Sequence, residues 1–387
     1  MKNILILGAT GSIGDSVMSV IKQNSDKLNL AGITFQSNLT KAISIIKEFK
    51  PNYAYCESRP NLISLDESIG KSQEIKLFSS KSELELLLNH KDIDIIISAI
   101  SGFAGLETTL MAAKTGKIIL LANKESIVVA GDILLPLAIK HNTNIIPIDS
   151  EHNAIFQCLD SEKNTDDVSK IIITASGGPF LNKRVEDLSA VTKREALNHP
   201  NWKMGSKISI DSATLVNKCL ELIEAKYLFD LSEEYFELVV HPQSIVHSIV
   251  TYKDGSSICQ MSNPDMRVPI SHALSLDESR LSLDYSKINF SSLNLTFQEF
   301  PHDRLEIANL AREICNLGGS AGTIFNAANE IAVKHFLNDK ITFNKIYDVI
   351  YRTFNAVPVS NDIDIEAIYE IDNQTRMEAH KVVKSLT

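Results

Sequence analysis

Apolar residues in the first 150 positions fall into short continuous runs separated by helical patterns. Ile4 to Leu7 is such a run, which is typical of a strand buried on both faces of a parallel sheet. The stretch after it has apolar residues at Val17, Val20 and Ile21, as in an amphipathic helix. Further apolar runs continue the order strand, helix, strand, at 30–35, 93–100, 118–122 and 145–148. The pattern predicts a Rossmann-like parallel sheet.

The pattern changes after residue 150. Short apolar runs separated by turns predict an open, antiparallel-rich sheet, with strands at 171–175, 233–240, 244–252 and 256–261. Such a sheet is a plausible surface for dimerisation. Four helical patterns close the chain and predict a small bundle, near 304–317, 321–337, 343–354 and 363–386.

The whole chain is therefore expected to be an α/β protein with three parts. Residues 1–150 would form a Rossmann-like domain, and residues 151–280 an α+β domain that also carries the dimer surface. Residues 281–300 show little periodicity and are expected to link it to a C-terminal α-helical domain at 301–387.

Composition and charge narrow the class of protein. The 387 residues are 44% hydrophobic and 22% charged, as in an ordinary globular chain. A net charge of −10 argues against a nucleic-acid or anionic-membrane partner. Five scattered cysteines fit a reducing compartment, no apolar run reaches membrane-spanning length, and residues 1–8 do not resemble a signal peptide. We expect a cytoplasmic enzyme.

A glycine turn follows the first strand, with Gly8, Gly11 and Gly14 spaced as G-x-x-G-x-x-G. A strand, a glycine turn and a helix in this order place backbone N–H groups where a pyrophosphate binds. The spacing departs from the usual G-x-G-x-x-G, and the alternative is a turn required only for tight packing.

The end of the second strand indicates which dinucleotide is favoured. Gln36-Ser37-Asn38 lacks the acid that usually binds the ribose hydroxyls of NAD, whereas Ser37 and Asn38 carry donors for a 2′-phosphate. The sequence therefore favours NADP, although no arginine or lysine occupies these positions and Lys41 lies three residues further on.

Asp149 and Glu151 follow the strand at 145–148. Carboxylates two residues apart on a strand share a face and would suit a hard divalent cation. Alternatively, Asp149 and Glu151 are solvent-exposed residues at the edge of the sheet, or they mark the start of a helix. Lys124, after the strand at 118–122, is placed for an anionic or carbonyl-bearing ligand, or is simply a solvated lysine.

The second half holds two polar turns. Ser176-Gly177-Gly178 offers a hydroxyl and free N–H groups for a phosphate, but also reads as a plain turn. Trp202, the single tryptophan, lies in a polar stretch at 198–207, which indicates a lid over a ligand or, alternatively, a loop held by a buried ring.

A helical pattern follows that stretch, with Asp211 or Ser212 as its expected cap. Asn217, Lys218 and Glu221 share one face of it and could hold a phosphate and a metal ion together. A surface Lys–Glu pair is the commoner outcome for such spacing. His247, on the face of Ile245 and Ile249, is expected to be a hydrogen-bonded structural residue.

Taken in order, the motifs resemble those of the 1-deoxy-D-xylulose 5-phosphate reductoisomerases from end to end. They are Gly-Ala-Thr-Gly-Ser-Ile-Gly (8–14), Leu-Ala-Asn-Lys-Glu-Ser (121–126), Asp-Ser-Glu-His (149–152), Ser-Gly-Gly-Pro-Phe (176–180), His-Pro-Asn-Trp-Lys-Met-Gly (199–205), Asp-Ser-Ala-Thr (211–214), Asn-Lys-Cys-Leu-Glu (217–221), His-Pro-Gln-Ser (241–244) and Asn-Ala-Ala-Asn-Glu (326–330). Their joint order is far more specific than any one of them.

The resemblance implies an NADPH-dependent enzyme that uses Mg²⁺ or Mn²⁺ in the non-mevalonate isoprenoid pathway. It implies metal ligation by Asp149, Glu151 and Glu221. It implies catalytic roles for Lys124 and the three metal ligands. It also implies substrate contacts at Lys124, Ser150, Glu151, Ser176, His199, Trp202, Ser212, Asn217, Lys218 and Glu221. It implies NADPH contacts at Thr10, Gly11, Ser12, Ile13, Asn38, Asn123, Glu125 and Gly205. The family is typically homodimeric and inhibited by fosmidomycin.

Two departures from the family pattern stand out. Gln36-Ser37-Asn38 replaces the Gly-Lys-Asn of some members, so the 2′-phosphate contacts stay open. Cys219 replaces a usual glycine in mid-helix, where no loss of activity is expected. Two alternative functions remain open. One is another NADP-linked, metal-dependent reductase of a small sugar phosphate, and the other is a redox-sensing NADP-binding protein.

Overall fold

The structure is a computed structural model that describes residues 1–70, 74–159, 165–275 and 278–387. Its contacts divide the chain into two compact units. The first unit comprises Met1–Asn123, Pro136–Asp149 and Met266–Tyr285, and the second comprises Lys124–Leu135, Ser150–Asp265 and Ser286–Thr387. Residues 266–275 and 278–280 thus belong to the first unit, whereas the hydrophobic pattern grouped them with the second part of the chain.

The first unit is built on a seven-stranded parallel sheet in the order β4-β3-β2-β1-β5-β6-β7. The strands are β1 (Lys2–Leu7), β2 (Leu28–Thr34), β3 (Tyr53–Tyr55), β4 (Lys76–Phe78), β5 (Ile95–Ser98), β6 (Ile118–Leu121) and β7 (Asn144–Pro147). The strand order reverses between β1 and β5, and such a switch point is where α/β sheets bind nucleotides. The expected Rossmann-like sheet is confirmed.

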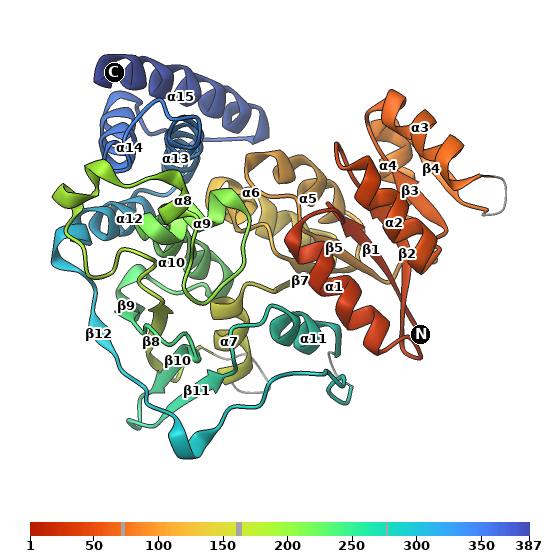
Figure 1. Cartoon of the computed structure of the whole chain (residues 1–387), viewed down its shortest axis with the longest axis horizontal. Coiled ribbons are helices and arrows are strands. Elements are labelled where there is room, and N and C mark those ends of the chain that lie inside the picture. The colour runs from red at the N-terminus through yellow and green to blue at the C-terminus, as the bar shows by residue number, and fades with distance from the viewer. Residues whose placement is uncertain (71–73, 160–164, 276–277) are drawn as a thin grey trace. The chain divides into compact units, whose positions relative to one another are not determined.

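Helices cover this sheet because each presents an apolar stripe to buried strands such as Ile4–Leu7. They are α1 (Ser12–Gln23), α2 (Leu39–Phe49), α3 (Arg59–Ile69), α4 (Lys81–Leu88), α5 (Leu106–Ala112) and α11 (Arg267–Ser275). The late helix α11 packs beside α1 (Figure 1). Lys2 and Asn24 strengthen this join through hydrogen bonds to the carbonyls of Leu274 and Ser282.

The second unit contains a five-stranded sheet in the order β11-β10-β8-β9-β12. Its strands are β8 (Val168–Ala175), β9 (Phe236–Val240), β10 (Val246–Tyr252), β11 (Ser257–Met261) and β12 (Gln298–Glu299). Only β8 and β9 run parallel among the described pairings, so the expected antiparallel-rich sheet is confirmed.

Helices of the second unit cover this sheet and form the C-terminal bundle. They are α7 (Ser150–Cys158), α8 (Lys193–Ala196), α9 (Ser206–Thr214), α10 (Val216–Phe229), α12 (Leu305–Leu317), α13 (Ala321–Leu337), α14 (Lys345–Ala356) and α15 (Ile365–Leu386). The last three pack against one another at the C-terminal end of the chain (Figure 1). Along the described ranges, no helix combines the length and the apolarity that a membrane span requires.

Two local expectations are wrong. Glu151 lies in the first turn of α7, so the shared face of a strand does not explain its position beside Asp149. Asp211 and Ser212 lie inside α9 and cap no helix, because α9 begins earlier, after Gly205. The break before α10 occurs instead at Leu215, whose φ of 63° is left-handed.

Candidate active site

The glycine turn after β1 brings the start of α1 close to the end of the strand. Gly8 has a φ of +83°, and a Cβ on Gly14 would lie 2.0 Å from the carbonyl oxygen of Ala9. Gly14 therefore lets α1 start directly against the end of β1. Thr10, Gly11, Ser12 and Ile13 form the helix start and are exposed or half-exposed. Gly11 caps α1 without a side-chain hydrogen bond, which leaves the first N–H groups for an anion.

The ends of β2 and β6 carry the remaining predicted cofactor residues of the first unit. Ser37 and Asn38 are exposed after β2, and Asn38 Oδ1 accepts a hydrogen bond from the backbone of Lys41 at the start of α2. The Lys41 ammonium lies 2.6 Å from Asp15. Asn123 is buried after β6, and its amide donates to the carbonyl of Gly102 at 3.0 Å. Donors rather than acids thus follow β2.

Three carboxylates form the centre of the candidate active site. Oxygens of Asp149, Glu151 and Glu221 all lie within 4.8 Å of one another. Asp149 directly precedes α7, Glu151 is in its first turn, and Glu221 is a fully buried residue of α10. Three clustered oxygen donors fit a hard divalent cation of the Mg²⁺ or Mn²⁺ type.

Two lysines partly neutralise these carboxylates. Lys124 begins α6 (Lys124–Lys140), is 6% exposed, and places Nζ 2.9 Å from Glu221 Oε1 and 3.2 Å from Asn217 Oδ1. Lys218 is 2.8 Å from Glu151 and also binds Glu221. Burial lowers the pKa of Lys218, but Glu151 and Glu221 raise it more, so the pKa lies above its ordinary value. The alternative of a solvated lysine is wrong for Lys124.

Ser150 and His152 frame the carboxylates within α7. The Ser150 hydroxyl donates to Glu151. His152 is fully buried, with Nε2 2.9 Å from the carbonyl oxygen of Glu221 and Nδ1 3.1 Å from Glu224. No role was predicted for His152 beyond its place in the Asp-Ser-Glu-His motif. It braces the backbone of the helix that carries Glu221.

A second polar group lies at the end of β8. His199 Nδ1 accepts hydrogen bonds from the backbone of Asn201 (3.1 Å) and Trp202 (3.0 Å), so the ring proton is on Nε2. Nε2 lies 2.9 Å from Ser176 Oγ, which also accepts from the Gly178 N–H at 3.1 Å. Ser176 therefore keeps its own proton to donate. Burial lowers the pKa of His199 to about 4.

The Ser-Gly-Gly turn also meets α9. A Cβ on Gly178, whose φ is +66°, would lie 2.7 Å from the carbonyl oxygen of Ser212. Glycine is needed here because the turn approaches the helix so closely. The turn that carries Ser176, which lies 2.9 Å from His199 Nε2, thus packs against the backbone of Ser212.

The Trp202 loop follows His199. The indole ring lies edge-on to His247, with ring centroids 6.0 Å apart. His247 is buried and its Nε2 lies 2.9 Å from Ser262 Oγ, as expected for a structural histidine. Gly205 is exposed at the start of α9, and the buried Glu125 carboxylate binds Lys207 at 2.8 Å. The loop rests on β10, and Lys207 is a residue whose contacts the sequence did not reveal.

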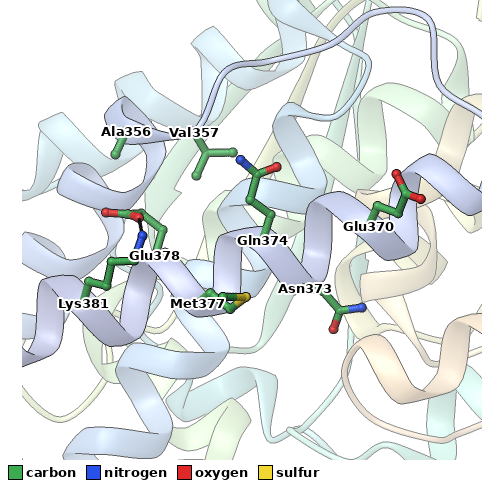
Figure 2. Close-up of a pocket in the computed structure, with 8 residues that line it drawn as sticks. All are labelled: Ala356, Val357, Glu370, Asn373, Gln374, Met377, Glu378 and Lys381. Carbon is green, nitrogen blue, oxygen red and sulfur yellow. Dashed lines mark hydrogen bonds and ion pairs between the residues drawn. The ribbon is translucent and has the colours of Figure 1, made fainter.

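A separate groove of about 440 Å³ lies between the end of α14 and α15 (Figure 2). Glu370, Gln374, Met377 and the Glu378–Lys381 ion pair line it. None of the predicted site residues belongs to it. The groove has mixed charge and is open, and it does not resemble the carboxylate and serine clusters.

Fold and site together define an α/β protein of the dinucleotide-binding type that also has a carboxylate–lysine centre. Family models described as 1-deoxy-D-xylulose 5-phosphate reductoisomerase and its C-terminal domains match residues 4–131, 145–229 and 261–378. The chain belongs to the 1-deoxy-D-xylulose 5-phosphate reductoisomerase family. The resemblance drawn from the motifs is confirmed.

Individual relatives match over nearly the whole length. The chain is 43% identical to a reductoisomerase of Vesicomyosocius okutanii over 385 residues, or 99% of each chain. It is 44% identical to one of Francisella tularensis over 376 residues, or 96% of each.

Solved structures of the family agree with this assignment. One, a complex with NADPH, fosmidomycin and magnesium, has a TM-score of 0.92 at 39% identity and covers 100% of this chain and 99% of that one. Another, from Zymomonas mobilis with NADPH, has a TM-score of 0.91 at 38% identity and covers all of both chains.

Proposed function

We propose that this protein converts 1-deoxy-D-xylulose 5-phosphate to 2-C-methyl-D-erythritol 4-phosphate in the non-mevalonate isoprenoid pathway, with NADPH and a divalent metal ion. The observation that carries the proposal is the cluster of Asp149, Glu151 and Glu221 with Lys124 and Lys218. Relatives of this name and their complexes with NADPH and magnesium support it.

Each group of side chains has a separate task. Asp149, Glu151 and Glu221 would hold Mg²⁺ or Mn²⁺, which supplies Lewis acidity toward a carbonyl when bound. Lys124, Ser150, Asn217 and Lys218 would contact the substrate beside them. Because Lys124 binds Glu221 and Lys218 binds both Glu151 and Glu221, the two lysines also weaken the repulsion between these acids.

The serine cluster suits the phosphate of the substrate. Ser176, Ser212 and His199 would donate hydrogen bonds to it, and the backbone of the Ser-Gly-Gly turn would add N–H groups. Trp202 would close over the bound substrate and exclude water. Holding the phosphate keeps the fragments of a rearranging carbon skeleton in place.

The glycine turn would bind NADPH, which supplies hydride to the rearranged aldehyde. Thr10, Gly11, Ser12 and Ile13 offer the helix start, and the donors Ser37 and Asn38 favour the 2′-phosphate. Asn123, Glu125 and Gly205 complete the proposed contacts. Glu125 would act there through its backbone, because its carboxylate is bound to Lys207.

The decisive experiment is an assay of purified protein with deoxyxylulose phosphate, NADPH and Mn²⁺. We expect NADPH consumption that requires the metal and that strongly prefers NADPH over NADH. Absence of consumption would refute the proposed activity, and equal use of both cofactors would refute the roles of Ser37 and Asn38.

Two other functions predict different outcomes in the same assay. A reductase of another small sugar phosphate would consume NADPH only with unrelated sugar phosphates. A redox sensor would bind NADPH without any turnover, and it has no need of three carboxylates that suit a metal. Retro-aldol and α-ketol routes to the aldehyde both fit the residues.

The proposal also covers the oligomeric state, the cellular compartment and the role of each domain. We place the protein in the cytoplasm as a homodimer, with the sheet of β8–β12 as the dimer surface. Residues 1–150 would bind NADPH, residues 151–280 would carry catalysis with a lid near 198–207, and residues 281–300 would link them to the helical domain at 301–387. Neither nucleic acid nor membrane is a proposed partner.

A further inference from the structure

Lys207 lies at the C-terminal end of the Trp202 loop, as the second residue of α9. Its Nζ lies 2.8 Å from Glu125 Oε1 in α6 and 2.8 Å from Asp211 Oδ2 in α9. The two carboxylate side chains are only 5% and 1% exposed. One ammonium thus joins two buried acids from different helices, an arrangement that fixes geometry because each acid needs the positive charge.

Helix α13 completes this network. Asn329 is fully buried and donates from Nδ2 to Asp211 Oδ1 at 2.9 Å. Burial lowers the pKa of Lys207, but Asp211, Glu125 and Glu330 raise it further, so that the pKa lies well above its ordinary value. The lysine therefore stays charged throughout the working pH range.

The N-terminal end of the loop is held by other contacts. His199 Nδ1 accepts from the backbone of Trp202, and Asn201 Nδ2 donates to the carbonyl of Pro242 at 2.7 Å and to Ser244 Oγ at 3.1 Å. Lys203, Gly205 and Ser206, between the two ends, are exposed. The loop is thus anchored at 199–201 and again at 207.

The second anchor, Lys207, is connected to the carboxylate centre through the first turn of α6. Glu125, which binds Lys207, follows Lys124, whose Nζ lies 2.9 Å from Glu221 Oε1. Both residues belong to the first turn of α6. A displacement of Lys207 would therefore separate the loop from the helix turn that contacts Glu221.

We propose that Lys207 is a positioning residue: it fixes the C-terminal end of the Trp202 loop to the first turn of α6, where Lys124 binds Glu221. The catalytic consequence rests on the proposed function, whereas the position of the loop does not. Because Trp202 is the only tryptophan, its fluorescence reports the loop alone.

The test compares Lys207→Met with the wild type and with Lys81→Met, which removes an exposed lysine paired with Glu107. In Lys207→Met we expect acrylamide to quench Trp202 more strongly and kcat to fall about tenfold or more. Lys207→Arg should restore much of both signals, and Lys81→Met should match the wild type.

A folded Lys207→Met protein with unchanged Trp202 quenching would overturn the proposal. Should Lys207→Met fail to fold, Asn329→Ala decides, because it keeps all three charges and removes only the donor to Asp211. Increased quenching in Asn329→Ala supports the proposal, and unchanged quenching overturns it. If the wild type shows no turnover, the proposed function fails while the quenching comparison still tests Lys207.

Discussion

Glu221 is the residue on which the charges of the site converge. It is fully buried, and both Lys124 and Lys218 bind its carboxylate. A buried carboxylate is tolerated only with such compensation, and removal of one partner leaves the other charges unbalanced. Glu221 therefore serves both the local fold and the proposed metal site.

Replacing Glu221 by Gln should lower kcat by roughly 100-fold or more, because the proposed metal site loses one negatively charged ligand. Loss of a residue that only supports a metal ligand already lowers metal affinity or activity by about 10–100-fold. NADPH binding, measured by fluorescence titration, should persist, since the glycine turn is untouched. Retention of most activity would exclude Glu221 as a ligand.

His199 makes a second prediction at this scale, because burial lowers its pKa from 6.5 to about 4. Between these values the unfolded chain binds the proton and the folded chain does not. Stability from this group is thus complete above pH 6.5 and is lost as the pH falls toward 4.

The measurement is urea unfolding of wild type and His199→Gln at pH 7, 6 and 5. The wild type should lose more stability than the variant over this range, since glutamine does not titrate. Parallel losses in the two proteins would contradict the low pKa of His199.

Among the elements, the turn between β1 and α1 leaves the least room for substitution. A Cβ on Gly14 would clash with the Ala9 carbonyl at 2.0 Å. Gly14→Ala should therefore cost roughly 1–3 kcal/mol of unfolding free energy and weaken NADPH binding.

The matched control is Gly11→Ala in the same turn. Gly11 has a φ of −81°, and its Cβ would meet Gly8 O at an ordinary 3.4 Å. Its unfolding free energy should stay near that of the wild type in urea titrations. Equal stability of both variants would show that α1 shifts to accommodate a methyl group at 14.

The sequence predicted the elements whose apolar period is strong and missed those set by one residue's conformation. The strand at Ile4–Leu7 and the helix at Ala321–Leu337 agree with β1 and α13 because their burial is continuous. The division between α9 and α10 was missed because the break at Leu215 requires a left-handed φ that leucine rarely adopts. No local sequence pattern predicts this break.

The same limit applies to the candidate site. The i,i+3 pair Lys218–Glu221 can be recognised in the sequence. The contact between Lys124 and Glu221 cannot, because the two residues are 97 positions apart. The sequence pattern indicated Lys124 and Glu221 as separate candidates, and only the family resemblance joined them in one site. Lys207 was missed although Asp211, four residues on, offered the spacing of a helical ion pair.

For the whole molecule, the open edge of the second sheet predicts assembly. Strand β11 is at the end of the strand order, and Ile258 on it is 49% exposed. Light scattering should give about twice the mass of the chain. Ile258→Lys should weaken the dimer, whereas Leu86→Lys, an exposed position of the first unit, should not. A monomeric wild type at micromolar concentration would contradict this prediction.

The division of the chain into two units has a consequence for how this protein can change over evolutionary time. The chain passes from one unit to the other five times, after Asn123, Leu135, Asp149, Asp265 and Tyr285. Neither unit is a contiguous piece of the gene, so recombination at one or two junctions cannot exchange the nucleotide fold for another. A new cofactor preference would have to arise by point substitutions such as those at 36–38, within an otherwise intact chain.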